Sequence, residues 1–536
     1  MSQQTAAKAG ESSSWVRAAS LARLQDKGRI VFRLDGRQIA LFDTPHGVRA
    51  CNNRCPHEGY PLTEGTLDPA CVLTCNWHNW KFDLTTGDNV YQGDRLRVYP
   101  AEIRGDDIWL DLSDPPFDVR RAEIFANLRE AFEDNVYDRI ARELGRLRLL
   151  CADPLDAARE AIHWSYDRME FGWTHAFAGL ADWLTLYGEH ERNPEARLIC
   201  LLEGIGHTAD DVLREGTFPF GEKRLQYDED EFVRAIERED ESTAIARIRG
   251  ALADGLGFKG LERGLTRAAL AHYNDFGHSL IYITKIETLI ERLGEVVAEP
   301  LLMSLVRGFI FAFREDRIPE FRGYAAALDA WGNGAGESAL HWSAFRKLGI
   351  DKSLNLTAKS AGADAMDLYC ALLGASASNM LAFDADQQYK VQIPVSDNVG
   401  WLDFTHGITF ANAVRRQCAK FPELWPRGLL QMACFNGRNA AFTCAEPDLS
   451  RWAVTDAEQF FVAAIERLFD HGLDEFIVSV HLLKTVLAAR EEARAAPSEI
   501  AQLLAAAVNR FLNTPLKRKQ VRRTAYQAMQ FVARDG

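Results

Sequence analysis

The strongest constraint on the fold of this chain is a pair of short motifs, Cys55-x-His57 and Cys75-x-x-His78, separated by seventeen residues. Each motif lies in a turn-rich stretch between strand-like runs, so two loops of a β-rich domain supply two thiols and two imidazoles. The metal centres that use such a ligand set are a [2Fe–2S] cluster and a four-coordinate zinc ion. The spacing therefore predicts a small β domain built around a metal centre at these four residues.

The residues around the two motifs favour the iron–sulfur cluster over zinc or a chance arrangement. The characteristic neighbours are Gly59, Pro61, Leu62 and Gly65 after the first motif, and Trp80, Lys81, Phe82, Asp83 and Gly87 after the second. With these neighbours, residues 15–112 resemble Rieske ferredoxin domains. The resemblance implies a [2Fe–2S] cluster with the two cysteines on one iron and the two histidines on the other.

Two residues of the second loop depart from this family, because Asn76 and Asn79 stand where Pro and Gly are usual. Respiratory members also carry a second cysteine in each loop, and these form a disulfide; Tyr60 and Trp77 occupy those places here. Without that disulfide, and without the usual hydroxyl near the sulfurs, we expect a reduction potential near the low end of the Rieske range of about −150 to +300 mV. Such a cluster is suited to electrons that come from NAD(P)H.

Composition and charge limit the partners and the compartment. The net charge of −14 argues against nucleic acid as a partner, and the apolar runs are shorter than the roughly twenty residues that span a membrane. The ten cysteines show no disulfide framework, which favours a cytoplasmic location. No Gly-x-Gly-x-x-Gly follows a strand-like run, so we expect an external NAD(P)H-dependent reductase or ferredoxin. The oligomeric state stays open.

The pattern of apolar residues changes once along the chain and predicts an α+β multidomain protein. Residues 1–14 are polar and small and are expected to be disordered. Strand-like alternation predicts an all-β domain over 15–113, followed by a proline-containing linker over 114–120. From 121 to 536 the periodicity is helical and predicts a large all-α domain. Its expected helices are 121–141, 156–178, 197–215, 230–253, 263–293, 300–313 and 456–489.

The helical part contains a recurring motif in which an acid and a phenylalanine precede a histidine. Its copies are 170–175, 275–278, 403–406 and, more loosely, 475–481. A Leu-Leu pair that begins the next helix follows each histidine by 22 to 26 residues, at Leu201, Leu301, Leu429 and Leu503. We therefore expect four related helix pairs packed as one bundle, with each histidine opening an apolar helix.

Two copies of the motif place a carboxylate and an imidazole three residues apart, which puts both on one face of a helix. These pairs are Asp275 with His278 and Asp403 with His406. They are similar to the acid-x-x-His elements of di-iron bundles, although those elements use Glu. The alternative interpretation is that each acid caps a helix and each histidine is packed in the core.

The recurrence of these histidines behind a cluster that must pass on its electron favours a redox metal site in the bundle. The candidate metal ligands are His175, Glu203, His207, His278, His406 and His481, and Glu203 and His207 form a further pair four residues apart. The candidate catalytic residues are His278, His406, Asp275 and Asp403. The sequence does not decide whether the two aspartates bind the metal or orient its ligands. Lys285 and Lys484 follow two of the histidines and are expected at the edge of the core.

The helical part also departs from the usual partner of a Rieske domain. Ring-hydroxylating Rieske oxygenases hold their iron in a curved-sheet domain with an Asp-x-x-His-x4-His element, which this sequence lacks. Residues 160–489 instead resemble questin oxidase-like proteins, which are helical oxygenases with motifs such as His278-Ser279-Leu280-Ile281. This resemblance implies oxidation of a polyketide-like aromatic compound.

These interpretations predict a Rieske-dependent oxygenase or monooxygenase. Electron transfer from the [2Fe–2S] cluster would reach a non-haem iron site, mononuclear or di-iron, that activates O2 to oxidise a small, largely apolar molecule. Four aromatic residues could surround that molecule or form plain core: Trp164, Trp173, Phe177 and Trp183. One alternative is an ordinary ring-hydroxylating oxygenase with a divergent iron domain, which a strand-rich domain would favour. The other is a non-catalytic redox carrier or sensor whose helical part binds a ligand or partner.

Overall fold

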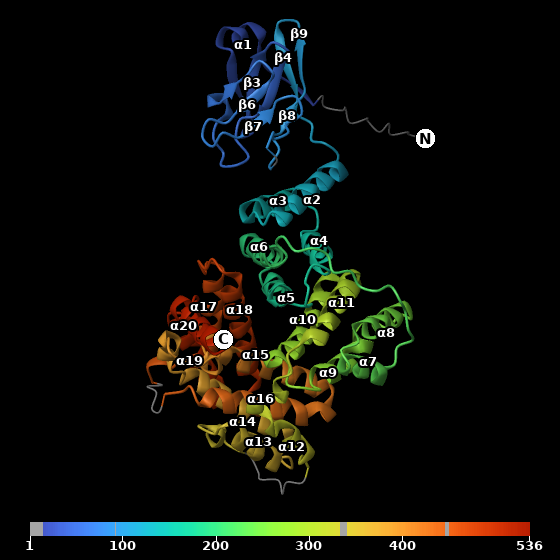
Figure 1. Cartoon of the computed structure of the whole chain (residues 1–536). Coiled ribbons are helices and arrows are strands. Elements are labelled where there is room, and N and C mark those ends of the chain that lie inside the picture. The colour runs from blue at the N-terminus through green and yellow to red at the C-terminus, as the bar shows by residue number, and fades with distance from the viewer. Residues whose placement is uncertain (1–13, 92, 333–339, 445–449, 536) are drawn as a thin grey trace, which may run out of the picture. The chain divides into compact units, whose positions relative to one another are not determined.

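The computed structural model describes residues 14–91, 93–332, 340–444 and 450–535 (Figure 1). The chain divides by its internal packing into two units, Met1–Asp153 and Pro154–Gly536. The first unit holds all the strands of the described residues, and the second is helical. The expected fold class, an N-terminal all-β Rieske-type domain followed by a large helical region, is confirmed. Apart from Ser14, the segment expected to be disordered lies outside the described residues.

Three small antiparallel sheets form the β domain, in the strand orders β1-β10-β9, β2-β3-β4-β8 and β5-β6-β7. The strands are β1 Trp15–Ser20, β2 Arg29–Leu34, β3 Arg37–Thr44, β4 Gly47–Asn52, β5 Thr66–Leu67, β6 Val72–Thr74, β7 Lys81–Asp83, β8 Val98–Tyr99, β9 Ala101–Arg104 and β10 Asp107–Asp111. A short helix, α1 (Leu21–Lys27), follows β1. The β2–β3 hairpin turns at Asp35 and Gly36, whose φ angles of 47° and 77° are those of the Asp-Gly turns that match strand twist.

The sheets place the two cysteine–histidine motifs at neighbouring loops. The first motif follows β4, and the second lies between β6 and β7. One of the two cores of the domain is formed around these loops and includes Cys55, Cys75, Leu62 and Phe82, each at most 3% exposed. The sequence therefore puts the thiols inside the core, while the loops that carry them stay at the end of the sheets.

A helical hairpin, α2 (Phe117–Glu133) and α3 (Tyr137–Leu149), completes the first unit. Helix α2 begins inside the expected linker, because proline is compatible with the residue before a helix and Pro116 is in that place. The carboxylate of Asp94 is fully buried and joins the hairpin to the β domain through Arg142 at 2.5 Å and Arg146 at 3.2 Å. The grouping expected from the sequence, in which these helices belong with the C-terminal part, differs from this packing.

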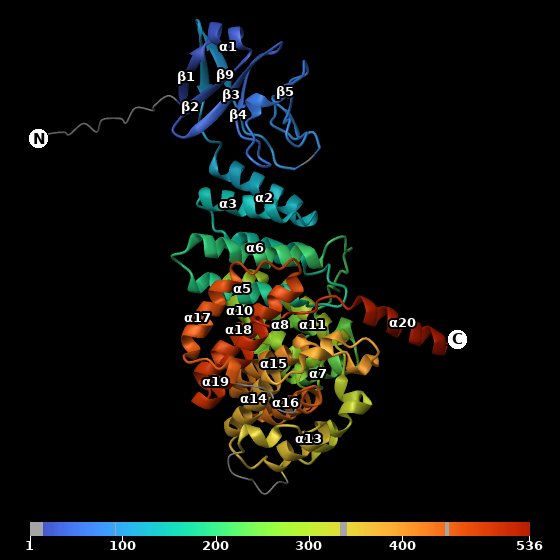
Figure 2. The same ribbon diagram turned by 90° about the vertical axis from the view of Figure 1, so that its left-hand side faces the viewer.

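The core of the second unit consists of four helix pairs (Figure 2). The pairs are α5 His175–Glu189 with α6 Pro194–Asp211, α10 His278–Leu293 with α11 Ala298–Phe311, α15 Trp401–Lys420 with α16 Trp425–Ala440, and α18 Phe476–Ala495 with α19 Ser498–Leu512. Within each pair the two helices pack on one another, and the first helices form a closed ring in the order α5, α10, α15, α18. Each expected helix pair is thus present, and one histidine of the recurring motif lies on each helix of the ring.

The second unit has nine further α-helices among its described residues. They are α4 Leu155–Ser165, α7 Glu229–Glu237, α8 Glu241–Ala253, α9 Phe258–Ala269, α12 Gly323–Asp329, α13 Ile350–Lys359, α14 Ala365–Leu381, α17 Ala457–Leu468 and α20 Val521–Asp535. Among the described residues, none of the helices has both the length and the apolar character that crossing a bilayer requires.

Five of the helices expected from periodicity are wrong as single helices, because each is interrupted by residues with left-handed backbone: 121–141, 156–178, 230–253, 263–293 and 456–489. Asn135 (φ 50°) lies between α2 and α3, and Glu239 (φ 59°) lies between α7 and α8. Gly172 (φ 85°) lies in the break between α4 and α5, and Gly472 (φ 61°) lies between α17 and α18. Between α9 and α10, Asp275 and Phe276 have φ angles of 46° and 49°. The connecting loops are partly buried, so their apolar residues continue the helical pattern across a break that the backbone cannot cross as a helix.

Candidate metal centres

The two loops of the β domain have the same backbone hydrogen bonds. In the first loop the N–H of Cys55 donates to the carbonyl of Tyr60 (2.9 Å), and the N–H of Gly59 donates to the carbonyl of Cys55 (2.8 Å). In the second loop the N–H of Cys75 donates to the carbonyl of Trp80 (2.7 Å), and the N–H four residues after Cys75 donates back to its carbonyl (2.9 Å). The two loops therefore share one backbone turn with their cysteines in equivalent positions, while His57 comes two residues and His78 three residues after its cysteine.

The two asparagines that depart from the Rieske pattern have defined roles in the second loop. Asn79 has a φ of 63°, and the equivalent Gly59 of the first loop has a φ of 76°. Asparagine is one of the few residues that tolerates this left-handed conformation, so it replaces glycine without changing the turn. The side chain of Asn76 donates to the carbonyl of Glu64 (2.9 Å) and accepts from the hydroxyl of Thr66 (3.0 Å). The loop is therefore tied to the neighbouring β5 segment.

The four expected ligands are arranged as a [2Fe–2S] centre of the Rieske type requires. Cys55 and Cys75 are 3% and 1% exposed, and the backbone N–H groups next to Cys55 point to its sulfur. Burial raises the pKa of the Cys55 thiol to about 11. The rings of His57 and His78 face solvent with their centroids 4.8 Å apart, and the indole of Trp80 stacks on His57. Two buried sulfurs behind two partly exposed imidazoles fit a cluster that these residues would hold.

Glu58 is a site residue that the sequence reasoning missed. Its carboxylate lies 4.0 Å from His57 Nε2 and 3.9 Å from His78 Nδ1. A single acid next to His57 forms no motif of its own in the sequence, and only the approach of the two loops places it beside both histidines. Its negative charge disfavours reduction of the centre, in agreement with the low potential expected from the sequence.

In the second unit, the imidazoles of His175, His278 and His406 converge from three helices of the ring, and His481 from the fourth helix lies beside His406. The Nε2 atom of His278 lies 3.1 Å from Nε2 of His175 and 2.9 Å from Nε2 of His406. The Nε2 atom of His481 lies 3.4 Å from that of His406, and the rings of His481 and His175 are 4.7 Å apart. Two nitrogens bound to one metal at about 2.1 Å and at a right angle are about 3 Å apart. The observed separations match this geometry.

The orientation of the rings is set by backbone carbonyls. The Nδ1 atom of His278 contacts the carbonyl of Asp275, that of His406 contacts Leu402 at 2.6 Å, and that of His481 contacts Ile477 at 2.5 Å. Because a carbonyl only accepts, each Nδ1 must carry the proton, and each Nε2 presents a lone pair to the centre of the cluster. Lone pairs that face one another at 3 Å repel unless a cation lies between them, so this donor set fits a metal ion.

Burial keeps the imidazoles neutral. It lowers the pKa of His278 to about 3 and lowers the pKa values of His175, His406 and His481 well below the usual value, and the nearby Lys484 ammonium lowers all four further. A neutral imidazole is the form that binds metals. The electrostatics of the cluster therefore agree with its geometry.

Lys484 lies deeper than the sequence predicts. The expected position is the edge of the core, but the residue is 2% exposed and its Nζ lies 3.1 Å from Nε2 of His406. Burial lowers the pKa of this amine to about 7, while Asp182 opposes that shift and Lys285 adds to it. Lys285 itself is paired with Asp182 at 2.6 Å. Lys484 therefore presents an amine to the histidine cluster, and a large fraction of this amine is neutral near pH 7.

The two candidate catalytic aspartates bind elsewhere. Asp403 accepts from the N–H of Gly400 (2.8 Å) and from Arg438 (3.0 Å), so it caps the start of α15. Asp275 accepts from the N–H of Phe313 (2.6 Å), and burial raises its pKa to about 6. The carbonyl of Asp275, rather than its carboxylate, orients a histidine of the cluster.

The expected pair of Glu203 and His207 is also separate from the four-histidine cluster. Glu203 contacts Nε2 of His471 at 2.9 Å. His207 stacks on Phe476 and lies 3.7 Å from Asp211. Both side chains lie on α6, the outer helix of its pair, whereas the converging histidines lie on the four helices of the ring.

An aromatic pocket of about 480 Å³ lies next to the histidine cluster. Its lining residues are Phe171, Trp173, Asp275, Ser279, Tyr282, Leu305, Gly308, Phe309, Phe311 and Phe313. The ring of Tyr282 joins the two sites, with its centroid 5.6 Å from His278 and 6.5 Å from His175. Of the four aromatic residues suggested by the sequence, only Trp173 lines this pocket.

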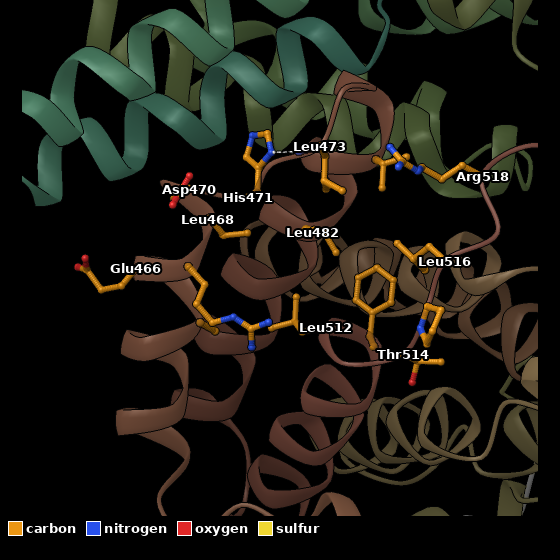
Figure 3. A pocket seen from close by; sticks show the side chains of 15 residues that line it. Glu466, Leu468, Asp470, His471, Leu473, Leu482, Leu512, Thr514, Leu516 and Arg518 are labelled. Carbon is orange, nitrogen blue, oxygen red and sulfur yellow. Dashed lines mark hydrogen bonds between the residues drawn. The ribbon is translucent and has the colours of Figure 1, made fainter.

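A larger hollow of about 710 Å³ is lined by residues of α17, α18, α19 and the segment after α19 (Figure 3). Its wall includes Leu468, Leu482 and Leu512 with the charged residues Glu466 and Arg518. None of the converging histidines lines it. Its larger size therefore does not make it the site of the redox chemistry.

Comparison with known proteins agrees with the architecture of the first unit. Residues 14–100 match the Rieske [2Fe-2S] domain family. The 3-phenylpropionate/cinnamic acid dioxygenase ferredoxin subunit of Shigella boydii serotype 4 is 36% identical over 76 residues, which are 14% of this chain and 72% of that protein. The chain thus carries an iron–sulfur domain of the ferredoxin type. It belongs to the Rieske [2Fe-2S] domain family through its N-terminal part.

Two further similarities concern the same part of the chain. The 4beta-methylsterol monooxygenase of Methylococcus capsulatus is 35% identical over 95 residues, which are 16% of this chain and only 26% of that protein. The ferredoxin of carbazole 1,9a-dioxygenase from Nocardioides aromaticivorans IC177 is 24% identical, and the match covers 18% of this chain and 98% of that one with a TM-score of 0.18. These matches cover only the N-terminal part of the chain, so they say nothing about the function of the helical unit.

Proposed function

We propose that this protein is a Rieske-dependent oxygenase that uses electrons from its [2Fe–2S] centre at a single non-haem iron in the helical unit. The substrate is a small, largely apolar organic molecule, and O2 is the co-substrate. The observation that carries this proposal is the approach of the Nε2 atoms of His175, His278 and His406, with that of His481 beside His406, from four separate helices. A chain that only packed its histidines would not bring these nitrogen atoms together.

One iron fits this site better than two. Di-iron bundles bridge their metals with carboxylates, and the metal-binding group formed by His175, His278 and His406 contains no acid. The carboxylates of Asp275 and Asp403 make hydrogen bonds outside it. An all-nitrogen set with neighbours about 3 Å apart matches the ligands of one ion.

The residues of the chain hold and shield such an ion. Iron in this position would supply the reaction with O2 that an organic side chain cannot perform. Three of the four imidazoles, those of His278, His406 and His481, are oriented by backbone carbonyls, which fixes their rings before any ligand binds. The adjacent aromatic pocket excludes water from the side where an apolar substrate would approach.

The alternatives receive less support. A ring-hydroxylating oxygenase with a divergent iron domain would need a strand-rich second unit, whereas the described residues from 154 onward contain no β-strand. A simple electron carrier has no need of a second convergent donor set. The electrons would come from a separate reductase or ferredoxin, and the likeness of the first unit to the ferredoxin subunit of a dioxygenase supports that partner.

Iron stoichiometry tests this proposal. The [2Fe–2S] centre accounts for two irons per chain, so we expect about three in the wild-type protein and about two in His278→Ala, with the Rieske EPR signal unchanged. His163→Ala is the control, because His163 is exposed on α4 and should leave all three irons in place. If wild type and His278→Ala both contain two irons, the histidine cluster is packed core and the proposal is wrong.

A further inference from the structure

The aromatic pocket has one polar wall. Asp275, Ser279 and Tyr282 lie on the segment that leads into α10 and on its first turns, while most other lining residues are apolar. Three phenylalanines at its mouth are exposed, with Phe171 at 60%, Phe311 at 49% and Phe313 at 78%. Large apolar side chains left in contact with water mark a binding surface more often than a random feature of a soluble unit. The pocket is therefore suited to an apolar ligand with one polar edge.

Only one oxygen of the Asp275 carboxylate accepts a hydrogen bond from the described part of the protein. One oxygen, Oδ1, accepts from the backbone N–H of Phe313 at 2.6 Å. Within the described part of the chain, the structure gives the other oxygen, Oδ2, no hydrogen-bond donor and no cation. A partly buried carboxylate with a free acceptor is costly unless a donor arrives from outside. Because Asp275 lines the pocket, a donor on a bound ligand would satisfy this oxygen.

The backbone around Asp275 is strained in a way that fixes this arrangement. Asp275 and Phe276 have φ angles of 46° and 49°, and Gly277 follows with 85°. Non-glycine residues adopt this conformation at a cost in free energy, and such strain persists chiefly at functional sites. A Cβ on Gly277 would meet the ring of Phe410 at 2.3 Å, so the turn also packs tightly. The same turn directs a carboxylate to the pocket and begins α10 with His278.

We propose that the aromatic pocket binds the substrate and that Asp275 determines its specificity, because Oδ2 accepts a hydrogen bond from a hydroxyl on an otherwise apolar ring system. This inference rests on the proposed function and names the class of its substrate. Ring and hydroxyl are recognised separately: the phenylalanines and Trp173 contact the ring, and Asp275 selects for a donor over a methylated or unsubstituted edge. Asp275 binds the substrate rather than the metal.

The substitution Asp275→Asn tests this role without removing volume. The amide oxygen can still accept from the N–H of Phe313, which leaves the NH2 group facing the pocket as a donor. The variant should therefore prefer a ligand with an acceptor at the same edge. We expect 2-naphthol to bind wild type about tenfold more tightly than 2-methoxynaphthalene. In Asp275→Asn this preference should disappear, and binding of 2-acetonaphthone should become at least as tight as that of 2-naphthol.

Isothermal titration of the three probes against the full chain measures these preferences. Asp329→Asn is the matched control, since Asp329 ends α12 and is exposed, and it should behave as wild type. Far-UV circular dichroism and the melting temperature show whether Asp275→Asn is folded. Two results would overturn the proposal. One is a folded Asp275→Asn protein that keeps the wild-type order of affinities, and the other is a wild-type protein that binds 2-naphthol and 2-methoxynaphthalene equally.

The titration tests the specificity role of Asp275 and the iron measurement tests the proposed function, so either proposal can be wrong while the other holds. Binding of the probes does not require the iron, so the same titration is repeated with His278→Ala. If wild type contains three irons but its ligand preference does not depend on Asp275, the specificity role is wrong and the proposed function stands. An Asp275-dependent preference in a wild-type protein that contains only two irons would remove the proposed function and retain the pocket as a site for a hydroxylated apolar ligand.

Discussion

At the scale of single residues, backbone conformation decides where the metal-binding side chains lie. Asn79 takes the left-handed place that Gly59 has in the first loop, and Asp275 and Phe276 do the same before His278. The sequence shows these residues as departures from a pattern or as the beginning of a helix. It does not show that the side chain of an asparagine can tolerate the turn, or that a loop rather than a helical turn precedes His278.

His272 gives a pH-dependent contribution to stability close to this strained turn. Its Nδ1 lies 2.9 Å from Asp316 and its Nε2 lies 2.8 Å from Glu237, and these two carboxylates raise its pKa to about 8. A raised pKa means that the folded state binds the proton more tightly than the unfolded state, whose histidine has a pKa near 6.5. The contribution, about 1–2 kcal/mol, is complete below about pH 6.5 and is lost as the pH rises through 8.

We therefore expect the melting temperature to fall between pH 6.5 and pH 8.5 more steeply in wild type than in His272→Gln. Differential scanning calorimetry in buffers of constant ionic strength measures this difference. Equal slopes in the two proteins would show that the two carboxylates do not hold the imidazole as the structure describes.

At the scale of elements, buried charge joins the hairpin of α2 and α3 to the β domain. Asp94 has no exposed side-chain surface and contacts Arg142 and Arg146. Removal of one partner from a buried ion pair leaves uncompensated charge and typically costs about 3–5 kcal/mol. We expect Asp94→Ala to lower the stability of the first unit by this amount, measured by denaturant unfolding followed through the visible absorption of the [2Fe–2S] centre.

A matched control is available on the same loop. Asp88 pairs with Arg95 at 2.7 Å, but both side chains are largely exposed, so Asp88→Ala should change the stability by less than about 0.5 kcal/mol. An Asp94→Ala protein as stable as the Asp88→Ala protein would contradict the packing of the hairpin on the β domain.

The helices could be predicted in pairs but not in their exact bounds. Each repeat of acid, phenylalanine and histidine marks a ring helix, and two of the four histidines, His175 and His278, are the first residues of their helices. His406 and His481 lie one turn further inside α15 and α18, where an additional turn precedes them. Periodicity reports which face of a segment is buried and continues across a buried loop, so it misses the breaks.

At the scale of the whole molecule, the two metal centres differ in how much of them the sequence contains. The four ligands of the first centre lie within 24 residues, so their spacing alone predicts it. The ligands of the second are spread from His175 to His481, and only their recurrence in one motif suggests that they meet. The roles of Asp275 and Lys484 depend on which helices face one another, and no local pattern contains that information.

We propose that the four histidines bind one iron that is distinct from the [2Fe–2S] centre. This iron is tested most directly in Cys55→Ser, which removes a ligand of the first centre and should abolish the Rieske EPR signal. Nitric oxide makes a mononuclear ferrous site visible by EPR. In the reduced Cys55→Ser protein we predict a ferrous–nitrosyl signal from one iron per chain, absent from Cys55→Ser with His406→Ala. A Cys55→Ser protein that folds but gives no such signal after anaerobic loading with iron would contradict the account.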